Sequence, residues 1–402
     1  MNRPHRISAT MKVYADYNAT APLRPEARDA MLAALDLTGN PSSVHAAGRR
    51  ARALVESARD RVAEAIGACR DDIAFCSGGT EAVQAPLLGA LRADPGLRLH
   101  LSAIEHDAAA PLRLAPQSNA NAPEQPPELP PELPVGADGV VDLAALRERV
   151  SAAASAGEHP LVSIMLVNNE TGVIQPVAEA AEIVHAAGGL IHCDAVQALG
   201  RIPVSIIDLD VDYLSLSGHK VGGPQGVGAF YVKPGAPFRA LQPGGGQEFG
   251  RRAGTENVAG VAAFAAATDA SLRDLGAYQS LATARDRMEA TLKACCPDVV
   301  VHGAGAGRVA GVSCFGLEGL PSETQVMAMD LAGFAISAGA ACSSGKVKAS
   351  RVLTAMGAGE AMAKSSIRTS FGWASDPAEF DALADAWIAL VSRARPQTIV
   401  TP

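Results

Sequence analysis

Strand-like and helix-like segments alternate through the first two thirds of this 402-residue chain. The runs Leu161 to Val167 and Leu190 to His192 are mainly apolar, which is typical of strands buried on both faces of a parallel sheet. Between them, Val177 to Ala187 has the pattern of a connecting helix, and Ala46 to Ile66 is a second helix with one apolar face. This order predicts an α/β fold whose mostly parallel sheet is covered by helices.

The pattern changes near residue 262, where long alanine-rich helices and a few strands follow. We therefore expect a large domain over residues 13–262 and a small domain over 263–402 together with 1–12. A site that uses both would lie between domains, where pockets are common. Residues 115–134 contain seven prolines and are predicted as an extended surface loop, because proline fits neither a helix interior nor a central strand.

Composition excludes several classes of function. The net charge of −8 argues against sequence-independent nucleic-acid binding, which needs a basic surface. No apolar run reaches the roughly 18 residues of a membrane span, and we see no secretory signal. Seven cysteines without a Cys-x-x-Cys spacing indicate a reducing compartment rather than a disulfide framework. We expect a cytoplasmic protein with neither a nucleic-acid nor a membrane partner, and with no metal in its active site.

Three separate features suit one cofactor. Lys220 is one of only seven lysines and follows Ser217-Gly218-His219 after the apolar run Val211 to Leu216; it is either a surface lysine or an amine that condenses with an aldehyde. Asp194 ends an apolar strand and either caps a turn or meets a ligand there. The turn Ser77 to Ala82 opens a helix and suits a phosphate. Together they describe pyridoxal phosphate, which needs an amine, an acid near its ring nitrogen and phosphate anchors.

The wider pattern resembles the cysteine desulfurases of the NifS/IscS type, within the class V aminotransferase-fold enzymes. The resemblance runs from Tyr14–Thr20 to Ser366–Arg368, and its intermediate motifs are Gly39–His45, Glu105-His106, Val167–Gly172 and Arg252–Asn257. It implies a pyridoxal-phosphate enzyme of fold type I, with a mostly parallel seven-stranded sheet in the large domain and a smaller α+β domain. It also implies a homodimer that acts on L-cysteine and passes sulfur to an iron–sulfur scaffold or another acceptor protein.

The resemblance assigns roles to individual residues. Lys220 holds the cofactor and moves protons at the substrate, Asp194 keeps the ring nitrogen protonated, and His106 stacks on the ring and acts as acid or base. The remaining cofactor contacts are Gln197 at the ring hydroxyl, Gly79, Thr80, Ser217 and His219 at the phosphate, Thr255 reaching in from a second subunit, and Asn168. Arg368, Asn168 and Asn18 receive the substrate, Arg368 through a fork that matches a carboxylate.

Cys342 decides the reaction that the resemblance implies. It lies in a run of small residues from Ser337 to Gly345, with Lys346 and Lys348 close by to favour ionisation. Its thiolate attacks the substrate sulfur, becomes a persulfide and leaves alanine. For the four cysteines Cys69, Cys76, Cys193 and Cys314 we expect buried, inert side chains instead. An aminotransferase or selenocysteine lyase of the same fold would need Lys220 and Asp194 but not this use of Cys342.

The sequence departs from the family pattern beside the chemistry rather than in it. Val83-Gln84 replaces a usual Asn-Asn pair after the phosphate turn, and Phe249 stands at a commonly basic position. The proline-rich segment displaces the strand that usually follows His106. These departures bear on partner contacts and tuning more than on activity.

Overall fold

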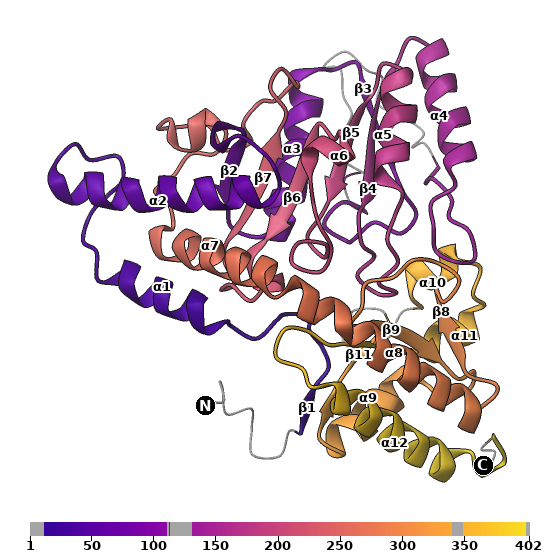
Figure 1. Ribbon diagram of the computed structural model, residues 1–402. Coiled ribbons are helices and arrows are strands. Elements are labelled where there is room, and N and C mark those ends of the chain that lie inside the picture. The colour runs from indigo at the N-terminus through magenta and orange to yellow at the C-terminus, as the bar shows by residue number, and fades with distance from the viewer. Residues whose placement is uncertain (1–11, 111, 113–130, 340–348, 399–402) are drawn as a thin grey trace.

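A computed structural model describes residues 12–110, 112, 131–339 and 349–398. Its main sheet has, in the described residues, six strands in the spatial order β2-β7-β6-β5-β4-β3 (Figure 1). Their bounds are β2 Ile73–Cys76, β3 Leu97–Leu101, β4 His159–Met165, β5 Leu190–Asp194, β6 Tyr213–Ser217 and β7 Gly228–Val232. Only β7 runs against its neighbours, so the mostly parallel sheet is confirmed.

Helices cover both faces of this sheet. On β7, Ala229 and Tyr231 belong to one buried cluster, whereas Phe230 and Val232 belong to another, as the alternation of side chains along a strand requires. The second cluster includes the apolar face of α3 (Gly79–Ala93), and the first includes residues of α2, α5 and α7. The apolar stripes of these helices therefore fold the chain into a helix–sheet–helix sandwich.

The two predicted helices are confirmed within one residue at each end. They are α2 (Ala46–Ala65) and α5 (Val177–Ala186). The remaining helices of the first part are α1 (Pro25–Leu35), α4 (Leu143–Ser155) and the short α6 (Ile206–Leu209). His45 begins α2 by accepting a hydrogen bond from the Gly48 N–H at 3.2 Å, which satisfies one of the free donors of the first turn.

The expected seventh strand is reduced to a single bridge. Ser102, just after β3, pairs in parallel with Leu133, and the Leu133 N–H donates to the Leu101 carbonyl at 2.8 Å. The prolines on either side of Leu133 lack N–H donors, so a longer ladder cannot form there. The predicted surface loop at 115–134 lies outside the described residues up to residue 130.

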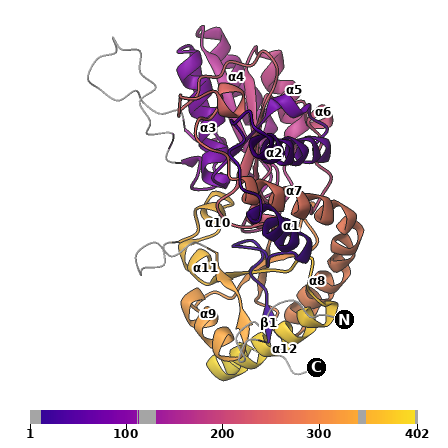
Figure 2. The same ribbon diagram turned by 90° about the vertical axis from the view of Figure 1, so that its left-hand side faces the viewer.

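In the described residues, the second part of the chain carries two smaller sheets. One has the order β11-β12-β9-β8, and in the other β1 (Val13–Tyr14) pairs in parallel with β10 (Phe334–Ala335). The strands of the first are β8 Val300–His302, β9 Val312–Gly316, β11 Ser337–Ala338 and β12 Ser366–Ser370. Its helices are α8 Leu275–Cys295, α9 Ser322–Leu331, α10 Arg351–Ala355, α11 Glu360–Lys364 and α12 Pro377–Ala394. Figure 2 shows this part below the main sheet.

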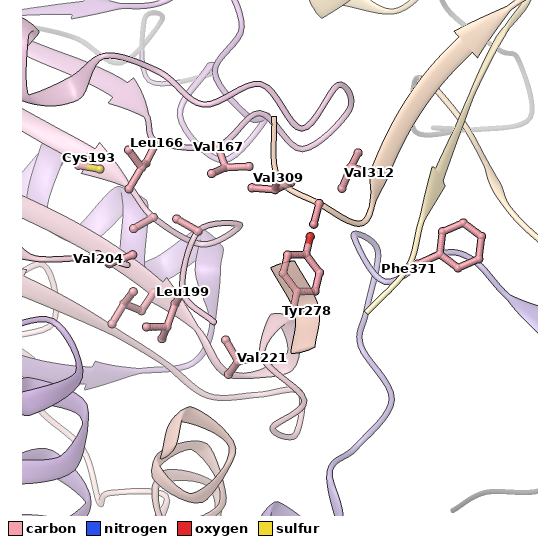
Figure 3. Close-up of a cluster of buried hydrophobic side chains, with 14 of the residues drawn as sticks. Leu166, Val167, Cys193, Leu199, Val204, Val221, Tyr278, Val309, Val312 and Phe371 are labelled. Atoms are coloured by element: carbon pink, nitrogen blue, oxygen red, sulfur yellow. The ribbon is translucent and has the colours of Figure 1, made fainter. Parts of the chain in front are cut away.

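Helix α7 (Val258–Arg273) joins the two parts without an irregular linker. The boundary predicted at residue 262 falls inside this helix, so the division into two domains stays a prediction. One buried cluster extends from Cys193 and Leu199 at the main sheet, through Tyr278 and Val309, to Phe371 (Figure 3). This shared apolar core holds the two parts against each other.

The cysteines divide by burial. Cys76, Cys193 and Cys314 are buried as predicted, and burial raises the pKa of each thiol. The prediction for Cys69 is wrong, because it is exposed where the short turn Arg70–Asp72 begins. Within the described ranges, no helix is both long and apolar enough to cross a membrane.

Candidate active site

A cavity of about 980 Å³ lies between the carboxyl ends of the parallel strands and the second part of the chain. It brings together ten of the predicted residues, from segments more than 300 residues apart. These are Asn18, Gly79, Thr80, His106, Asp194, Gln197, Ser217, His219, Lys220 and Arg368. The strand-end rule for open α/β sheets therefore located the cavity correctly.

Lys220 enters this cavity from a short turn, Gly218–Lys220, at the end of β6. Its Nζ donates to the main-chain carbonyls of Asn18 at 2.5 Å and Ala19 at 2.8 Å. Burial is the largest cause that lowers its pKa to about 7, and the positive charges of Arg368 and Arg201 add to it. A substantial share of this amine is therefore neutral and nucleophilic at pH 7.

Asp194 faces the same cavity from the end of β5. Its Oδ1 accepts a hydrogen bond from the Val196 N–H at 2.9 Å. Burial raises its pKa, while the charges of His106 and Lys220 act in the opposite direction. Gln197 is also buried, and its Nε2 donates to the Asn18 carbonyl at 3.0 Å.

The first turn of α3 forms the other end of the cavity. Gly78 precedes it with φ 149° and ψ −174°, a conformation that is essentially restricted to glycine. This geometry presents the first N–H groups of α3, the positive end of the helix dipole, beside Thr80 and Ser217. His219 also lines the cavity, and burial followed by the charge of Lys220 lowers its pKa to about 4, so its ring is neutral.

Arg368 reaches the cavity from β12. Its Nη2 donates to Asp16 Oδ1 at 2.8 Å and its Nη1 to the Asn169 carbonyl at 3.1 Å. Asn18 is fixed nearby, since its Nδ2 donates to the Asn169 carbonyl at 2.8 Å and its Oδ1 accepts from Arg201 at 2.5 Å. A buried guanidinium in a polar corner of the cavity suits a small carboxylate.

Two predicted residues do not line the cavity. The Asn168 side chain is used by its own turn, because Oδ1 accepts from the Glu170 and Thr171 N–H groups, each at 2.9 Å, and Nδ2 donates to the Ile104 carbonyl at 3.3 Å. Its neighbour Asn169 lies at the wall instead. Thr255 is exposed and away from this chain's cavity. The roles given to both stay predictions.

His106 borders the cavity, and its Nδ1 accepts from the Ala108 N–H at 3.0 Å, which leaves Nε2 for other contacts. Cys342 lies outside the described residues. Gly339 and Ala349, the described residues on either side of 340–348, both line the cavity.

Sequence reasoning gave no role to several charged residues at or beside the cavity. Glu105 and Glu170 line it, and burial raises the pKa of Glu105 to about 8 and that of Glu170 to about 7. Arg201 is buried behind Asn18, and Asp16 pairs with Arg368. Both Asp16 and Glu105 stand inside recognised motifs, but only the folded chain shows what they contact.

Three buried polar atoms at the cavity lack a hydrogen-bond partner in the part of the chain that the structure describes. They are Gln197 Oε1, Ser217 Oγ and Arg368 Nε. Buried polar groups are rarely left unpaired, so each indicates a ligand contact. Their positions fit pyridoxal phosphate with a bound amino acid: Ser217 beside the α3 N-terminus, Gln197 beside Asp194 and Arg368 in the carboxylate corner.

Comparisons with known proteins agree with this site. The aminotransferase class-V family model matches residues 13–383. The chain is 40% identical over 390 residues to a cysteine desulfurase of Cereibacter sphaeroides, covering 96% of this chain and 97% of the relative. It is 36% identical over 365 residues to cysteine desulfurase IscS of Dictyoglomus turgidum, covering 90% of each. A solved NifS-like protein from Rickettsia africae ESF-5 superposes with a TM-score of 0.83 at 30% identity, covering 95% of this chain and 99% of that one. The chain belongs to the aminotransferase class-V family of pyridoxal-phosphate-dependent proteins, among its cysteine desulfurases.

Proposed function

We propose that this chain is a cysteine desulfurase that removes sulfur from L-cysteine, releases L-alanine and carries the sulfur as a persulfide on Cys342. One observation supports it above the others: a single cavity holds a lysine with a lowered pKa, a strand-end aspartate and a buried arginine. The relatives named as cysteine desulfurases point to the same reaction.

The position of each residue in the cavity indicates its role. Pyridoxal phosphate, when bound, supplies an electron sink next to the substrate Cα. Asp194 would stabilise the proton on the ring nitrogen, and Ser217, His219 and the first turn of α3 would hold the phosphate. Lys220 Nζ would hold the cofactor covalently, and its amine would accept the proton from the substrate Cα. Arg368 holds the substrate carboxylate.

The sulfur step belongs to Cys342. Its thiolate attacks the substrate sulfur, so an S–S bond forms while the Cβ–S bond breaks, and the electron pair of that bond passes to the carbon side. Protonation there gives alanine, with Lys220 and His106 as the proton donors at hand. A reductant or an acceptor thiol then takes the outer sulfur from Cys342.

The flanks of segment 340–348 support this assignment. Cys342 is three residues from Gly339, which lines the cavity, and three extended residues reach at most about 10 Å. An aminotransferase would give a keto acid and no sulfide. Purified holoenzyme should therefore convert L-cysteine, in the presence of a reductant, to equal amounts of alanine and sulfide. Formation of a keto acid, or alanine without sulfide, would contradict the proposal.

Cofactor uptake should depend on pH through Lys220. Only the neutral amine reacts with an aldehyde, and a pKa of about 7 places the transition in the neutral range rather than near 10.5. We expect the uptake rate of the apoprotein to rise about tenfold per pH unit below pH 7 and to level off above it. Stopped-flow absorbance on mixing with pyridoxal phosphate measures this, with apoprotein of Lys220→Ala as the blank. A rate that still climbs tenfold per unit above pH 9 would contradict the lowered pKa.

Arg368→Gln should weaken substrate binding while leaving cofactor binding intact. Hydrogen bonds between charged groups contribute about 1.5–3 kcal/mol, so we expect KM for L-cysteine to rise roughly 10- to 100-fold. Arg287→Gln is the matched control, because Arg287 pairs with Asp381 on the surface. Steady-state kinetics should show an unchanged KM in that control; equal effects in both variants would remove Arg368 from the substrate site.

The proposal also covers the oligomeric state of the enzyme and the protein that receives its sulfur. We propose a homodimer in which Thr255, exposed and outside its own cavity, contacts the cofactor of the partner subunit. We also propose a cytoplasmic role in which the persulfide passes to an iron–sulfur scaffold or another acceptor protein. A persulfide-transfer assay against candidate scaffolds identifies the recipient.

A further inference from the structure

Glu105 is a buried acid at the cavity wall for which the proposed reaction has no use. Only 1% of it is exposed, and the negative charge of Asp194 acts on it. Its Oε1 accepts two hydrogen bonds, from Ser102 Oγ at 2.7 Å and from the Met165 N–H at 2.8 Å. Its Oε2 contacts Ser163 Oγ at 3.3 Å. Two buried carboxylates that interact electrostatically would repel each other if both were charged, so it matters which of them carries a proton.

A chain of hydrogen bonds leads from Glu105 away from the cavity. Ser163 Oγ lies 2.9 Å from His192 Nδ1, and His192 Nε2 lies 2.7 Å from Ser215 Oγ. Ser215 Oγ in turn donates to the Ala82 main-chain carbonyl at 2.7 Å. A carbonyl oxygen can only accept, so this last contact fixes the direction of the whole chain.

The direction of these hydrogen bonds determines whether Glu105 carries a proton. Because the Ser215 proton goes to Ala82, Ser215 must accept from His192, which therefore carries its proton on Nε2. Burial lowers the pKa of His192 to about 3, so the ring is neutral and its Nδ1 is an acceptor. The Ser163 hydroxyl therefore donates its one hydrogen bond to His192 Nδ1, at an O···N distance of 2.9 Å. No proton is then left for a hydrogen bond between Ser163 Oγ and Glu105 Oε2, unless Glu105 itself carries one and donates it.

We propose that Glu105 is an uncharged carboxylic acid, held in that state by the chain through Ser163, His192 and Ser215, so that Asp194 is the buried carboxylate of the pair. That Glu105 is neutral follows from the hydrogen bonds alone. That Asp194 must be the charged acid rests on the proposed function, because the cofactor's ring nitrogen needs that charge. An uncharged Glu105 takes no part in the proposed reaction.

The other groups packed around Glu105 agree with a neutral acid. Burial, together with the negative charge of Asp194, raises its pKa to about 8. Cys193, next to His192 on β5, has a buried thiol whose pKa is also raised. Arg351 approaches from α10, but it donates to the main-chain carbonyl of Glu105 rather than to the carboxyl group. His106 and Lys220 lower the pKa of Asp194, which favours its charged form.

Replacing each acid by its amide should affect alanine formation little at Glu105 and strongly at Asp194. Glutamine reproduces a protonated glutamate, with Oε1 accepting from Ser102 and Met165 and Nε2 donating to Ser163. We therefore expect Glu105→Gln to keep the cofactor spectrum and to form alanine within about threefold of the parent rate. Asp194→Asn in the same cavity should lose at least about 100-fold, in line with the loss of one preorganised charge. Equal, large losses in both variants would overturn the proposal.

Infrared spectroscopy tests the proton directly and does not require activity. The difference spectrum between the parent holoenzyme and Glu105→Gln at pH 7 should contain a carboxylic-acid C=O band that shifts in D₂O. Carboxylate bands in its place would overturn the proposal. The same measurement on the apoproteins separates the inference from the proposed function, because the acid band should remain there whatever reaction the chain catalyses.

Discussion

Replacing Lys220 by alanine or by arginine is expected to give a colourless protein with alanine formation reduced by roughly 10³-fold or more. Arginine keeps the positive charge but has no neutral amine at accessible pH, so charge alone should not rescue activity. Absorbance of the purified variants and alanine release from L-cysteine measure both effects. The fold should survive, because the Lys220 side chain contacts only two main-chain carbonyls by hydrogen bonds within the described residues.

Lys233 provides the matched control for this substitution. It stands on the surface at the end of β7, paired with Asp210 at 2.8 Å, and that hydrogen bond raises its pKa. Lys233→Ala should therefore keep colour and rate. A coloured, active Lys220→Arg protein would show that another amine holds the cofactor.

Cys342→Ala is expected to abolish persulfide formation and to lower sulfide release by at least about 100-fold, while the protein stays yellow. The physical reason is that no thiolate would remain to attack the substrate sulfur, whereas Lys220 and Asp194, the proposed cofactor contacts, are unchanged. Sulfide release after addition of L-cysteine and a reductant measures the effect. Sulfide release that continues at the parent rate would contradict the proposed mechanism.

Cys69→Ala tests whether any accessible thiol would serve. Cys69 is exposed, as a sulfur-transfer cysteine must be, but it stands at the turn Arg70–Asp72 and not at the cavity wall. Its loss should leave both rates unchanged. A comparable fall in Cys69→Ala would mean that the sulfur leaves through a different thiol.

The sequence could place several cavity residues together because the carboxyl ends of parallel strands lie at one edge of the sheet. Asp194, Ser217 and Lys220 each follow an apolar run, and the carboxyl ends of neighbouring parallel strands meet at one edge of the sheet. The glycine turn before α3 was readable for a similar reason, since Gly78 adopts a backbone conformation that other residues avoid.

Sequence reasoning could not assign contacts where a side chain's partner lies on another segment. The role of Asn168 stays a prediction; in the structure its amide oxygen accepts hydrogen bonds within its own turn. The hydrogen bonds that fix the proton on Glu105 pass through three further strands and a helix, so nothing in the dipeptide Glu105-His106 predicts them. The seventh strand was expected from the resemblance and is limited by prolines to the bridge at Leu133.

The most direct test of the account is a single turnover with isotopically labelled sulfur. Holoenzyme mixed with one equivalent of sulfur-labelled L-cysteine, without reductant, should release one alanine per site. Mass spectrometry of its peptides should then find one labelled sulfur atom on the peptide that contains Cys342 and none on the peptide that contains Cys69. Alanine released with the label on another cysteine, or free in solution from the first turnover, would contradict the account.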